Sequence, residues 1–411
     1  MKRRRLLGFT GTFLAIVLLG LGLLQTQFFA RFLLSQAGRT LGLELSASAI
    51  HYQLRGTPAL EVSGLSAKQI GQDTPLLKSQ RIEVTLPWQT LRNLGAPLVL
   101  ERIALDAPVL DIPALQRWLA SRPSAETTQL PTLRSGLSVH QGQVRNNDWD
   151  IENITLTLPH FVPTQPMQLR VSGRYIDAPL QANANLHIDL DSPEALLNKR
   201  SADLRSRGTL DIHGDGWNLS TQISLAGPLR IGKDSVLLKP AKIGIAGRYA
   251  VGTTQTSFKL SLDGPMLFDD ANWRFVPVAV TLQGDNLVPS FTARGQIAAG
   301  RELRLRLDGT MAHWPSGWPA LPVPLSANAA PYTFTLRYTG TPDLANTTQL
   351  TLQQDKTHFE ATFQLPDVLR WIDGNNSTPL PPLTGKLTTP RIEMSGVILE
   401  GVEVELDSNH E

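Results

Sequence analysis

The side chains of this sequence that are best spaced to hold a metal ion are Asp211, His213 and Asp215. They alternate with Ile212 and Gly214, and a β-strand points every second side chain to the same face. Carboxylate and imidazole groups brought together in this way can bind zinc or a hard cation. No second group of ligands can be assigned to complete the shell. We therefore interpret these residues as the solvent face of a strand that runs into a turn, and we expect no metal and no other cofactor.

Catalytic groups are equally scarce in the sequence. The chain has no Cys, which excludes a disulfide scaffold, a Cys-ligated zinc site and a cysteine nucleophile. It contains no P-loop, no GxSxG elbow and no HExxH motif. The pair Asp269 and Asp270 could serve acid–base chemistry only in a cleft, and it is explained more simply as a turn before Trp273. We therefore expect that the protein is not an enzyme.

The charges of the chain are concentrated at its start. The formal net charge of the 411 residues is +2, and it includes Lys2, Arg3, Arg4 and Arg5. Without these four cations the rest of the chain has a formal charge of −2. A protein that binds nucleic acid should carry a basic field over its folded part. We therefore expect no nucleic-acid partner and interpret the basic tip as a signal for membrane topology.

An uncharged apolar segment follows the basic tip. The stretch from Leu6 to Leu24, which includes Phe13 and Ile16, has the length of about 20 residues that a membrane-spanning helix requires. Lys and Arg on the N-terminal side place residues 1–5 in the cytoplasm and the chain after the apolar segment on the opposite side of the membrane. The alternative is a cleaved signal peptide, but Phe28 fits the small-residue cleavage pattern poorly. We expect an uncleaved anchor.

Alternation of apolar and polar residues dominates the rest of the chain and predicts strand after strand. Trp217–Leu225 and Tyr332–Tyr338 show it most clearly, in runs of about five to nine residues that end at Gly, Pro, Asn or Asp. The same pattern recurs at Ile154–Leu158, Leu186–Leu190, Phe258–Leu262, Val278–Leu282, Leu303–Leu307 and Leu350–Leu352. Helical patterns are short and begin at Pro, as in Pro87–Leu94, Pro113–Arg122 and Pro366–Ile372.

These patterns predict a mainly β protein. We expect an N-terminal transmembrane helix and then an elongated, curved antiparallel sheet, folded like an open taco, with a few short helices. The expected parts are an anchor with an interfacial helix (1–42), a β unit with short helices (43–128), a β-meander that forms a groove (129–312), a Pro- and Trp-rich joint (313–324) and a C-terminal β unit (325–411).

The apolar face of such a sheet can be used in two ways. A closed sandwich would bury the face against itself, whereas an open, curved sheet would leave a groove in which acyl chains are shielded from water at about 0.8 kcal/mol per CH₂. The candidate lining residues are apolar positions in phase on their strands, although the sequence does not tell which face is concave. They are Trp217, Leu219, Ile223, Leu225, Tyr332, Phe334 and Leu336.

Two segments resemble a known family. Residues 41–112, from LGLELSASAIHYQL to LVLERIALDAPVLDI, resemble the N-terminal β unit of the AsmA-like, or chorein-like, proteins. Residues 380–406, LPPLTGKLTTPRIEMSGVILEGVEVEL, are similar to that family's closing strands. The resemblance implies a single-pass protein of the inner membrane of a Gram-negative bacterium, with its bulk in the periplasm. It further implies a role in moving phospholipid and in outer-membrane biogenesis, and it brings no catalytic residue.

The function expected from the sequence is thus binding or transfer of phospholipid, or of another acyl lipid, along a hydrophobic β-groove. The expected partners are the inner membrane, an acyl lipid and envelope assembly or secretion proteins. The alternative is a non-enzymatic structural or adaptor protein of the periplasm with a closed core, related to the N subunit of type II secretion.

Overall fold

The computed structural model describes residues 38, 42–53, 56–92, 98–121, 130–232, 235–252, 254–269, 272–285, 287–318, 330–373, 381–394 and 397–406. Strands make up 69% and helices 8% of this part, so the expected β class is confirmed. None of the helices described there has the length and apolar character needed to span a membrane. The chain divides into two compact units. The first unit comprises the described residues up to Pro163 and Met167–Gln181, and the second comprises Thr164–Pro166 and the described part of Ala182–Glu411.

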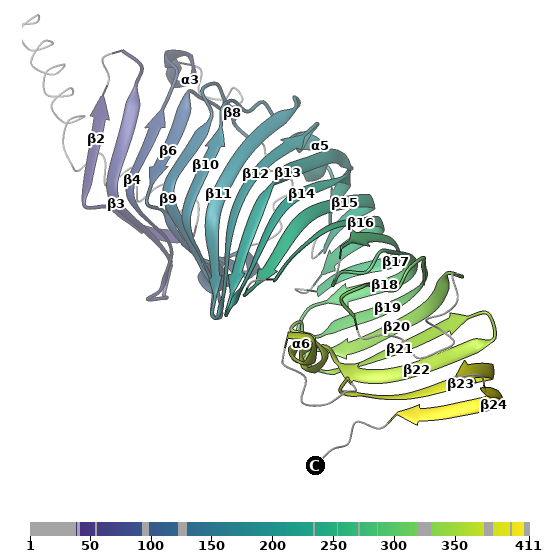
Figure 1. Ribbon diagram of the computed structural model, residues 1–411. Helices are drawn as coiled ribbons and strands as arrows, with labels where there is room; N and C mark the ends of the chain where they lie inside the picture. Colours follow the sequence, from purple (N-terminus) through teal and green to yellow (C-terminus); the bar gives the residue numbers. More distant parts are fainter. Residues whose placement is uncertain are drawn as a thin grey trace, which may run out of the picture. The chain divides into compact units, whose positions relative to one another are not determined.

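The first unit is built on a sheet of mixed direction (Figure 1). Its strands are β1 (Leu43–Ser46), β2 (Ala49–Gln53), β3 (Ala59–Gln69), β4 (Pro75–Thr85), β6 (Arg102–Asp106), β7 (Val109–Asp111), β9 (Leu137–Arg145), β10 (Asp150–Leu158) and β11 (Met167–Asp177). Strand β3 pairs antiparallel with β1, β2 and β4, and β4 pairs antiparallel with β6 and β7. At the other side, β10 pairs antiparallel with β9 and β11.

Three strand pairs of the first unit are parallel, whereas an antiparallel sheet was expected. Strand β9 pairs in parallel with β6 and β7, and the short β5 (Val99–Leu100) pairs in parallel with β8 (Thr132–Leu133). Parallel pairing needs a crossover of a dozen or more residues. The chain between β7 and β9 contains the helix Ile112–Ala120, and the parallel pairing places the start of β9 at the end of the sheet at which β6 begins.

The three helices expected from the sequence are confirmed: α3 (Trp88–Arg92), α4 (Ile112–Ala120) and α6 (Leu365–Asp373). Each begins at or next to a proline. The start of α4 is capped by Asp111, whose Oδ1 accepts a hydrogen bond of 2.8 Å from the backbone N–H of Ala114. A fourth helix, α5 (Pro193–Leu197), was not expected, because a single turn carries no periodicity to detect.

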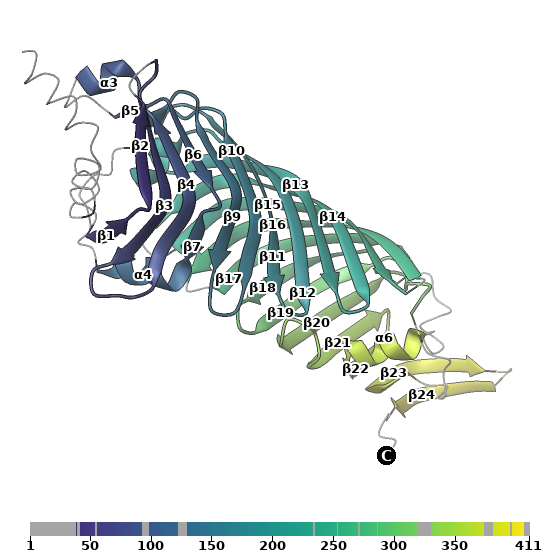
Figure 2. The ribbon, with the colours of Figure 1, turned by 90° about the vertical axis from the view of Figure 1, so that its left-hand side faces the viewer.

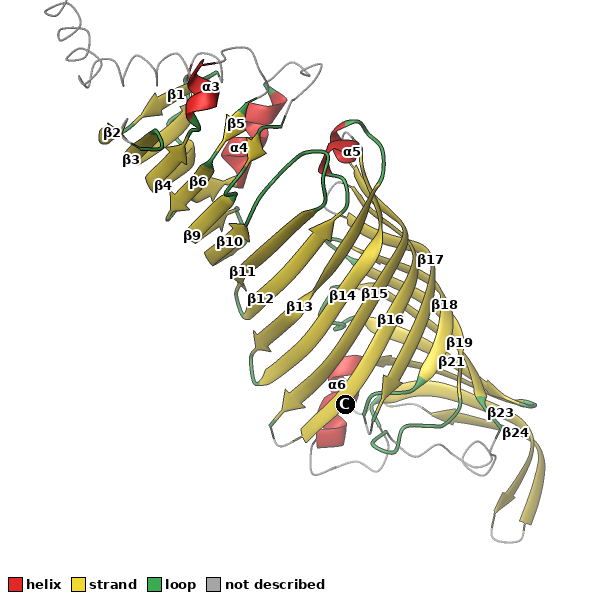
Figure 3. Cartoon of the chain, turned by 90° about the horizontal axis from the view of Figure 1, so that it is seen from above, coloured by secondary structure: helices red, strands yellow, loops and turns green. Residues whose placement is uncertain are grey.

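Consecutive antiparallel hairpins build the second unit (Figures 1 and 2). From β13 to β24 every strand pairs with the next one along the chain. The strands are β12 (Leu180–Leu190, from Ala182 on in this unit), β13 (Ala202–Gly214), β14 (Trp217–Ile231), β15 (Ser235–Val251), β16 (Thr254–Asp269), β17 (Asn272–Gly284), β18 (Phe291–Ala299), β19 (Leu303–Met311), β20 (Tyr332–Gly340), β21 (Thr347–Gln354), β22 (Thr357–Gln364), β23 (Leu383–Met394) and β24 (Val397–Leu406). The sheet is curved, as Figure 3 shows.

Several of these strands are longer than the expected five to nine residues. Strands β13 to β17 have 13, 15, 17, 16 and 13 residues. On β14 to β17 the expectation was wrong because the prolines lie inside the strands, in β-bulges, and do not end them. Register shifts occur between Ala226 and Leu229, Leu238 and Ala241, Asp263 and Met266, and Phe275 and Val278. We call this line of bulges, which crosses four strands at one level, the proline line; its prolines are Pro228, Pro240, Pro265 and Pro277.

Glycine makes the proline line possible. A Cβ on Gly227 would lie 2.1 Å from the carbonyl oxygen of Pro240, and a Cβ on Gly264 would lie 2.3 Å from that of Pro277. Bulges bend a strand and increase its twist. The apolar side chains before and after each bulge remain on one face. On β16, for example, Leu262 and Met266 belong to the same core cluster or pack against it.

Candidate functional site

The apolar face of the second unit is continuous from strand to strand. A single cross-strand row of register partners runs Leu225, Ile243, Leu262, Val280, Ala293, Gly309, Phe334, Leu352, Phe359 and Leu387. Nine of these ten residues are apolar side chains that belong to or pack on one core cluster, and the tenth is Gly309. The two stretches with the clearest alternation in the sequence, on β14 and β20, therefore share one face of the sheet.

The structure places all seven candidate lining residues on this apolar face. Ile223 shares a row with Tyr332, through Ile245, Leu260, Leu282, Phe291 and Met311. Leu225, Tyr332, Phe334 and Leu336 lie in the main core or pack against it. Trp217 and Leu219 lie on the same face closer to the β13–β14 hairpin, where the ring of Trp217 is 6.0 Å from that of Tyr249.

Side chains fill the middle of the face. Leu238, Val278, Leu352 and Leu387 are at most 2% exposed. Such burial is typical of a well-packed protein core. Around these residues the apolar side chains become half-buried, among them Ile297, Leu305, Leu350 and Phe363.

A hollow of about 220 Å³ lies on this face along β20 and β21. Phe334, Leu336, Leu350 and Leu352 form its floor. Side chains from outside the sheet also line it. Trp318 and Pro289 stand at one end, and Leu344 and Leu365 stand at the other. Of these, Leu365 is the first residue of α6, which lies beside the ends of β21 and β22 (Figures 1 and 2).

Two aromatic side chains at the wall of this hollow direct their polar groups into hydrogen bonds with the backbone. The hydroxyl of Tyr338 donates to the carbonyl oxygen of Thr341 at 2.6 Å. The indole N–H of Trp318 donates to the carbonyl oxygen of Leu287 at 2.7 Å. What these two aromatic residues present to the hollow is therefore ring carbon. The hollow is thus lined by apolar atoms, and it is not sealed from its surroundings.

A hydrogen-bonded turn fixes the end of the hollow at Leu344. The neighbouring Asp343 accepts hydrogen bonds from the hydroxyl of Thr341 and, at 3.1 Å, from the backbone N–H of Ala345. Both hydrogen bonds stabilise the carboxylate and lower the pKa of Asp343 below its ordinary value. The hydrogen bond from the Thr341 hydroxyl is the larger cause of this shift. The carboxylate form thus favours the conformation of the turn that carries Leu344.

Sequence reasoning missed the residues at the ends of the hollow. Trp318 belongs to the segment expected to be a Pro- and Trp-rich joint, and its ring lines the hollow and touches Trp314, with 4.9 Å between ring centroids. Leu344 lies in a turn and Leu365 precedes the helical pattern. No local pattern marks either residue, because their positions depend on contacts with distant strands.

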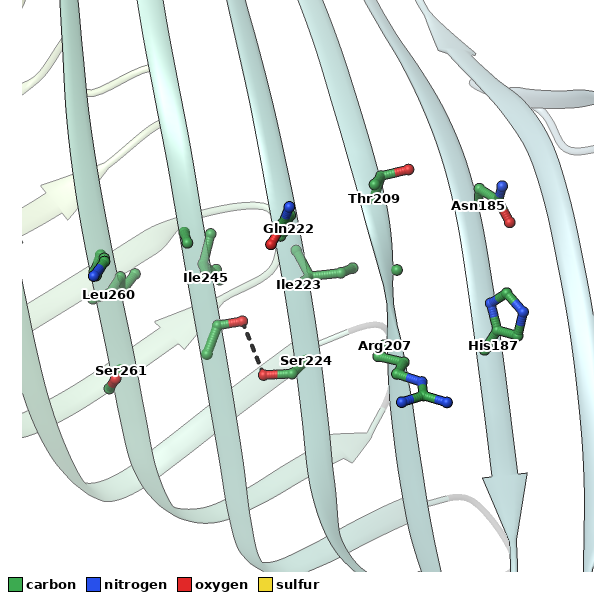
Figure 4. Close-up of a pocket in the computed structure, with 14 residues that line it drawn as sticks. Asn185, His187, Arg207, Thr209, Gln222, Ile223, Ser224, Ile245, Leu260 and Ser261 are labelled. Atoms are coloured by element: carbon green, nitrogen blue, oxygen red, sulfur yellow. Dashed lines mark hydrogen bonds between the residues drawn. The ribbon is translucent and has the colours of Figure 1, made fainter.

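The opposite face of the sheet is polar. A shallow hollow of about 770 Å³ lies across β12 to β16, and Ile223, Ile245 and Leu260 line it together with polar residues (Figure 4). Gly244 lines it, and the hydroxyl of Ser224 donates to the carbonyl oxygen of Gly244 at 3.4 Å. Asn185, His187, Arg207 and Lys259 also line it. Arg207 and Lys259 are on strands three spacings apart, roughly 14 Å. This arrangement offers dispersed polar contacts and no paired acid and base.

Among the residues that the structure describes, no group of three or more His, Asp or Glu side chains could hold a metal ion. His213 instead lies with Nδ1 at 2.7 Å from Oδ1 of Asn218. Asp269 forms an ion pair with Arg274, and Asp270 lies outside the described residues. The predicted anchor residues Leu6, Phe13, Ile16 and Leu24 and the topology charges Lys2, Arg3, Arg4 and Arg5 also lie outside the described part of the chain.

Comparisons of the chain with protein-family models, with curated proteins and with solved structures found no match.

Proposed function

We propose that the second unit binds the hydrocarbon chain of a lipid on its apolar face. The observation that supports this most directly is the hollow along β20 and β21, which is lined by Phe334, Leu336, Leu350 and Leu352 and exposes apolar atoms. Its volume of about 220 Å³ exceeds the 150 Å³ of an engineered apolar cavity that binds benzene. A hollow of this size suits the end of one acyl chain.

The driving force for this binding is the removal of hydrocarbon from water. Each methylene group that enters the hollow contributes about 0.8 kcal/mol, and no ion or hydrogen bond is needed. The half-buried apolar residues next to the hollow, such as Ile297 and Leu383, can cover the next part of the chain. The headgroup then remains in water at the edge of the sheet.

The wider role follows from the sequence. The basic tip, the apolar segment of residues 6–24 and the resemblance to AsmA-like proteins support a single-pass protein of the bacterial inner membrane with its bulk in the periplasm. In this role the protein binds or transfers phospholipid and contributes to outer-membrane biogenesis. Transfer is passive, and its direction is set by other components.

A second candidate function has one observation in its favour. The near-complete burial of Leu238, Val278, Leu352 and Leu387 also fits a structural or adaptor protein whose apolar face is closed on itself. In that case the hollow is a packing defect and the protein acts through partners such as secretion components.

Filling the hollow separates the two functions. Leu336→Trp places a larger side chain into the hollow. The matched control is Leu219→Trp, because Leu219 is a half-buried leucine on the same face that does not line the hollow. We expect the purified full-length protein to bind a fluorescent fatty acid, and we expect Leu336→Trp to weaken this binding at least tenfold with Leu219→Trp close to the wild type. Equal affinities of the wild type and both variants, with unchanged melting temperatures, would exclude the hollow as the binding site.

A further inference from the structure

The two ends of the strands in the second unit differ in the side chains that they expose. In an antiparallel meander, alternate connections lie at the same end of the sheet. One end carries the segment before β13 and the hairpins β14–β15, β16–β17 and β18–β19, and we call it the Trp273 rim. The other end carries the connections β13–β14, β15–β16 and β17–β18, and we call it the Trp217 rim.

Exposed apolar side chains gather at the Trp273 rim. Trp273 is 47% exposed, Ile231 is 41% exposed and Leu197 of α5 is 45% exposed. Large apolar residues at a hairpin tip are unusual in water, where turns are normally polar. At the Trp217 rim, by contrast, Trp217 is half-buried against Tyr249.

The Trp273 rim is continuous with the apolar face. A row of register partners along it runs Ile231, Val236, Phe268, Trp273, Ala299 and Leu303, and all six are apolar. The rings of Phe268 and Trp273 are in contact, with 4.7 Å between centroids. Val236 packs directly against the main core. The exposed side chains are therefore the outer edge of the face that contains the hollow.

Exposed basic side chains accompany these apolar tips and outnumber the exposed carboxylates of the same rim, Asp191, Asp203 and Glu302. The exposed Lys and Arg residues of the Trp273 rim are Lys199, Arg200, Arg230, Arg274, Arg301 and Arg304. Two of them form ion pairs with carboxylates of the rim, Arg274 with Asp269 and Arg304 with Glu302. At the Trp217 rim, the described residues within two positions of the three connections include Asp215 and Asp285 but no Lys or Arg.

We propose that the Trp273 rim contacts the surface of an anionic lipid membrane. Trp and aliphatic side chains enter the boundary between headgroups and acyl chains, while Lys and Arg interact with anionic headgroups. Successive hairpin tips at one rim are two strand spacings, roughly 10 Å, apart. Separate tips at this distance suit a fluid lipid surface, which accepts each side chain independently. The proposal goes beyond lipid binding in the hollow, because the rim can contact a membrane whether or not the hollow is filled.

The chain contains no Cys, so one probe can be attached at a chosen position. Full-length protein with Trp273→Cys is labelled with a polarity-sensitive fluorophore and incorporated into unlabelled vesicles. Acceptor vesicles of phosphatidylcholine and phosphatidylglycerol with a quencher on their acyl chains are then added. The matched control is Trp217→Cys, at the opposite rim of the same face. We expect several-fold stronger quenching at 273 than at 217, and loss of most of it at about 0.5 M salt, where charges are screened beyond a few ångströms.

Two further variants complete the test. The double variant Arg230→Glu, Arg301→Glu should reduce quenching at 273, because it reverses two charges that would attract anionic headgroups. Neither residue takes part in the two ion pairs described at the rim. Leu336→Trp should leave the quenching unchanged, so a failure of binding in the hollow can be distinguished from a failure of membrane contact. Equal quenching at 273 and 217 would overturn the proposal. The proposal would also be overturned if the fluorescence of the probe at 273 changed on addition of unlabelled copies of this protein but not on addition of vesicles. The rim would then be a protein interface.

Discussion

The indole N–H of Trp318 donates a hydrogen bond of 2.7 Å to the carbonyl oxygen of Leu287, across 31 positions of the chain. This bond joins the segment that follows β19 to the segment that precedes β18. Because both segments stand at the same end of the hollow, the bond fixes the position of that end wall. It also explains why a stretch rich in Pro and Trp lies against the sheet.

Removing the bond without removing the ring should therefore have a modest effect. Trp318→Phe keeps an aromatic wall and deletes the donor, so we expect a loss of about 1 kcal/mol in the free energy of unfolding. Trp318→Ala also removes the ring and should cost more, about 3 kcal/mol or above. Denaturant titration of both variants measures this order, and equal losses would show that the ring contributes nothing to the wall.

The proline line should be sensitive to a single methyl group. Gly264→Ala would bring a Cβ to 2.3 Å from the carbonyl oxygen of Pro277, which is backbone and cannot swing aside. We expect a loss of about 1 to 3 kcal/mol in the free energy of unfolding, as for an overpacked core. Gly244→Ala is the matched control, because its nearest neighbour within 4 Å is the mobile hydroxyl of Ser224. A variant Gly264→Ala as stable as Gly244→Ala would show that the bulged strands can shift freely.

Leu352 should be the most costly truncation on the apolar face. Its side chain is 0% exposed, and Leu→Ala at such positions costs about 2 to 5 kcal/mol. Leu399 on β24 is 46% exposed, so Leu399→Ala should stay within about 0.5 kcal/mol of the wild type. Chemical denaturation measures both. A small loss for Leu352→Ala would mean that the centre of the face is less tightly packed than its burial indicates.

The turn that carries Leu344 should respond to pH through Asp343. The pKa of this carboxyl is lowered, first by the hydroxyl of Thr341 and then by the N–H of Ala345, so the native state prefers the carboxylate. Its contribution to stability is present above the pKa of the unfolded chain and is lost as the pH falls through the lower, native pKa. The difference in unfolding free energy between the wild type and Asp343→Asn should therefore shrink on acidification. A difference that stays constant with pH would contradict this role.

Much of the fold could be predicted from the sequence because alternation is a local property. The phase of Trp217, Leu219, Ile223 and Leu225 on β14 determines which side chains share a face, and pairing in register extends that face across neighbouring strands. Helices α4 and α6 were predictable for a similar reason, since a proline and a short apolar period mark each of them.

What could not be predicted depends on contacts between distant segments. Pro240 and Pro277 look like strand ends in the sequence, and only the matching bulges on β14 and β16 let the strands continue past them. The position of Trp318 depends on a carbonyl group in the connection between β17 and β18. The parallel pairing of β9 with β6 and β7 depends on the path of a crossover, which has no signature in the strands themselves.

The neighbour-to-neighbour order of β13 to β24 has a consequence for how this architecture can change. Each interior strand is held by the strand before it and the strand after it. Duplication or loss of one whole hairpin would therefore leave the direction and the partners of every other strand compatible with the sheet. Such a protein can lengthen or shorten in steps of two strands during evolution, and the reach of its apolar face becomes a quantity that selection can adjust.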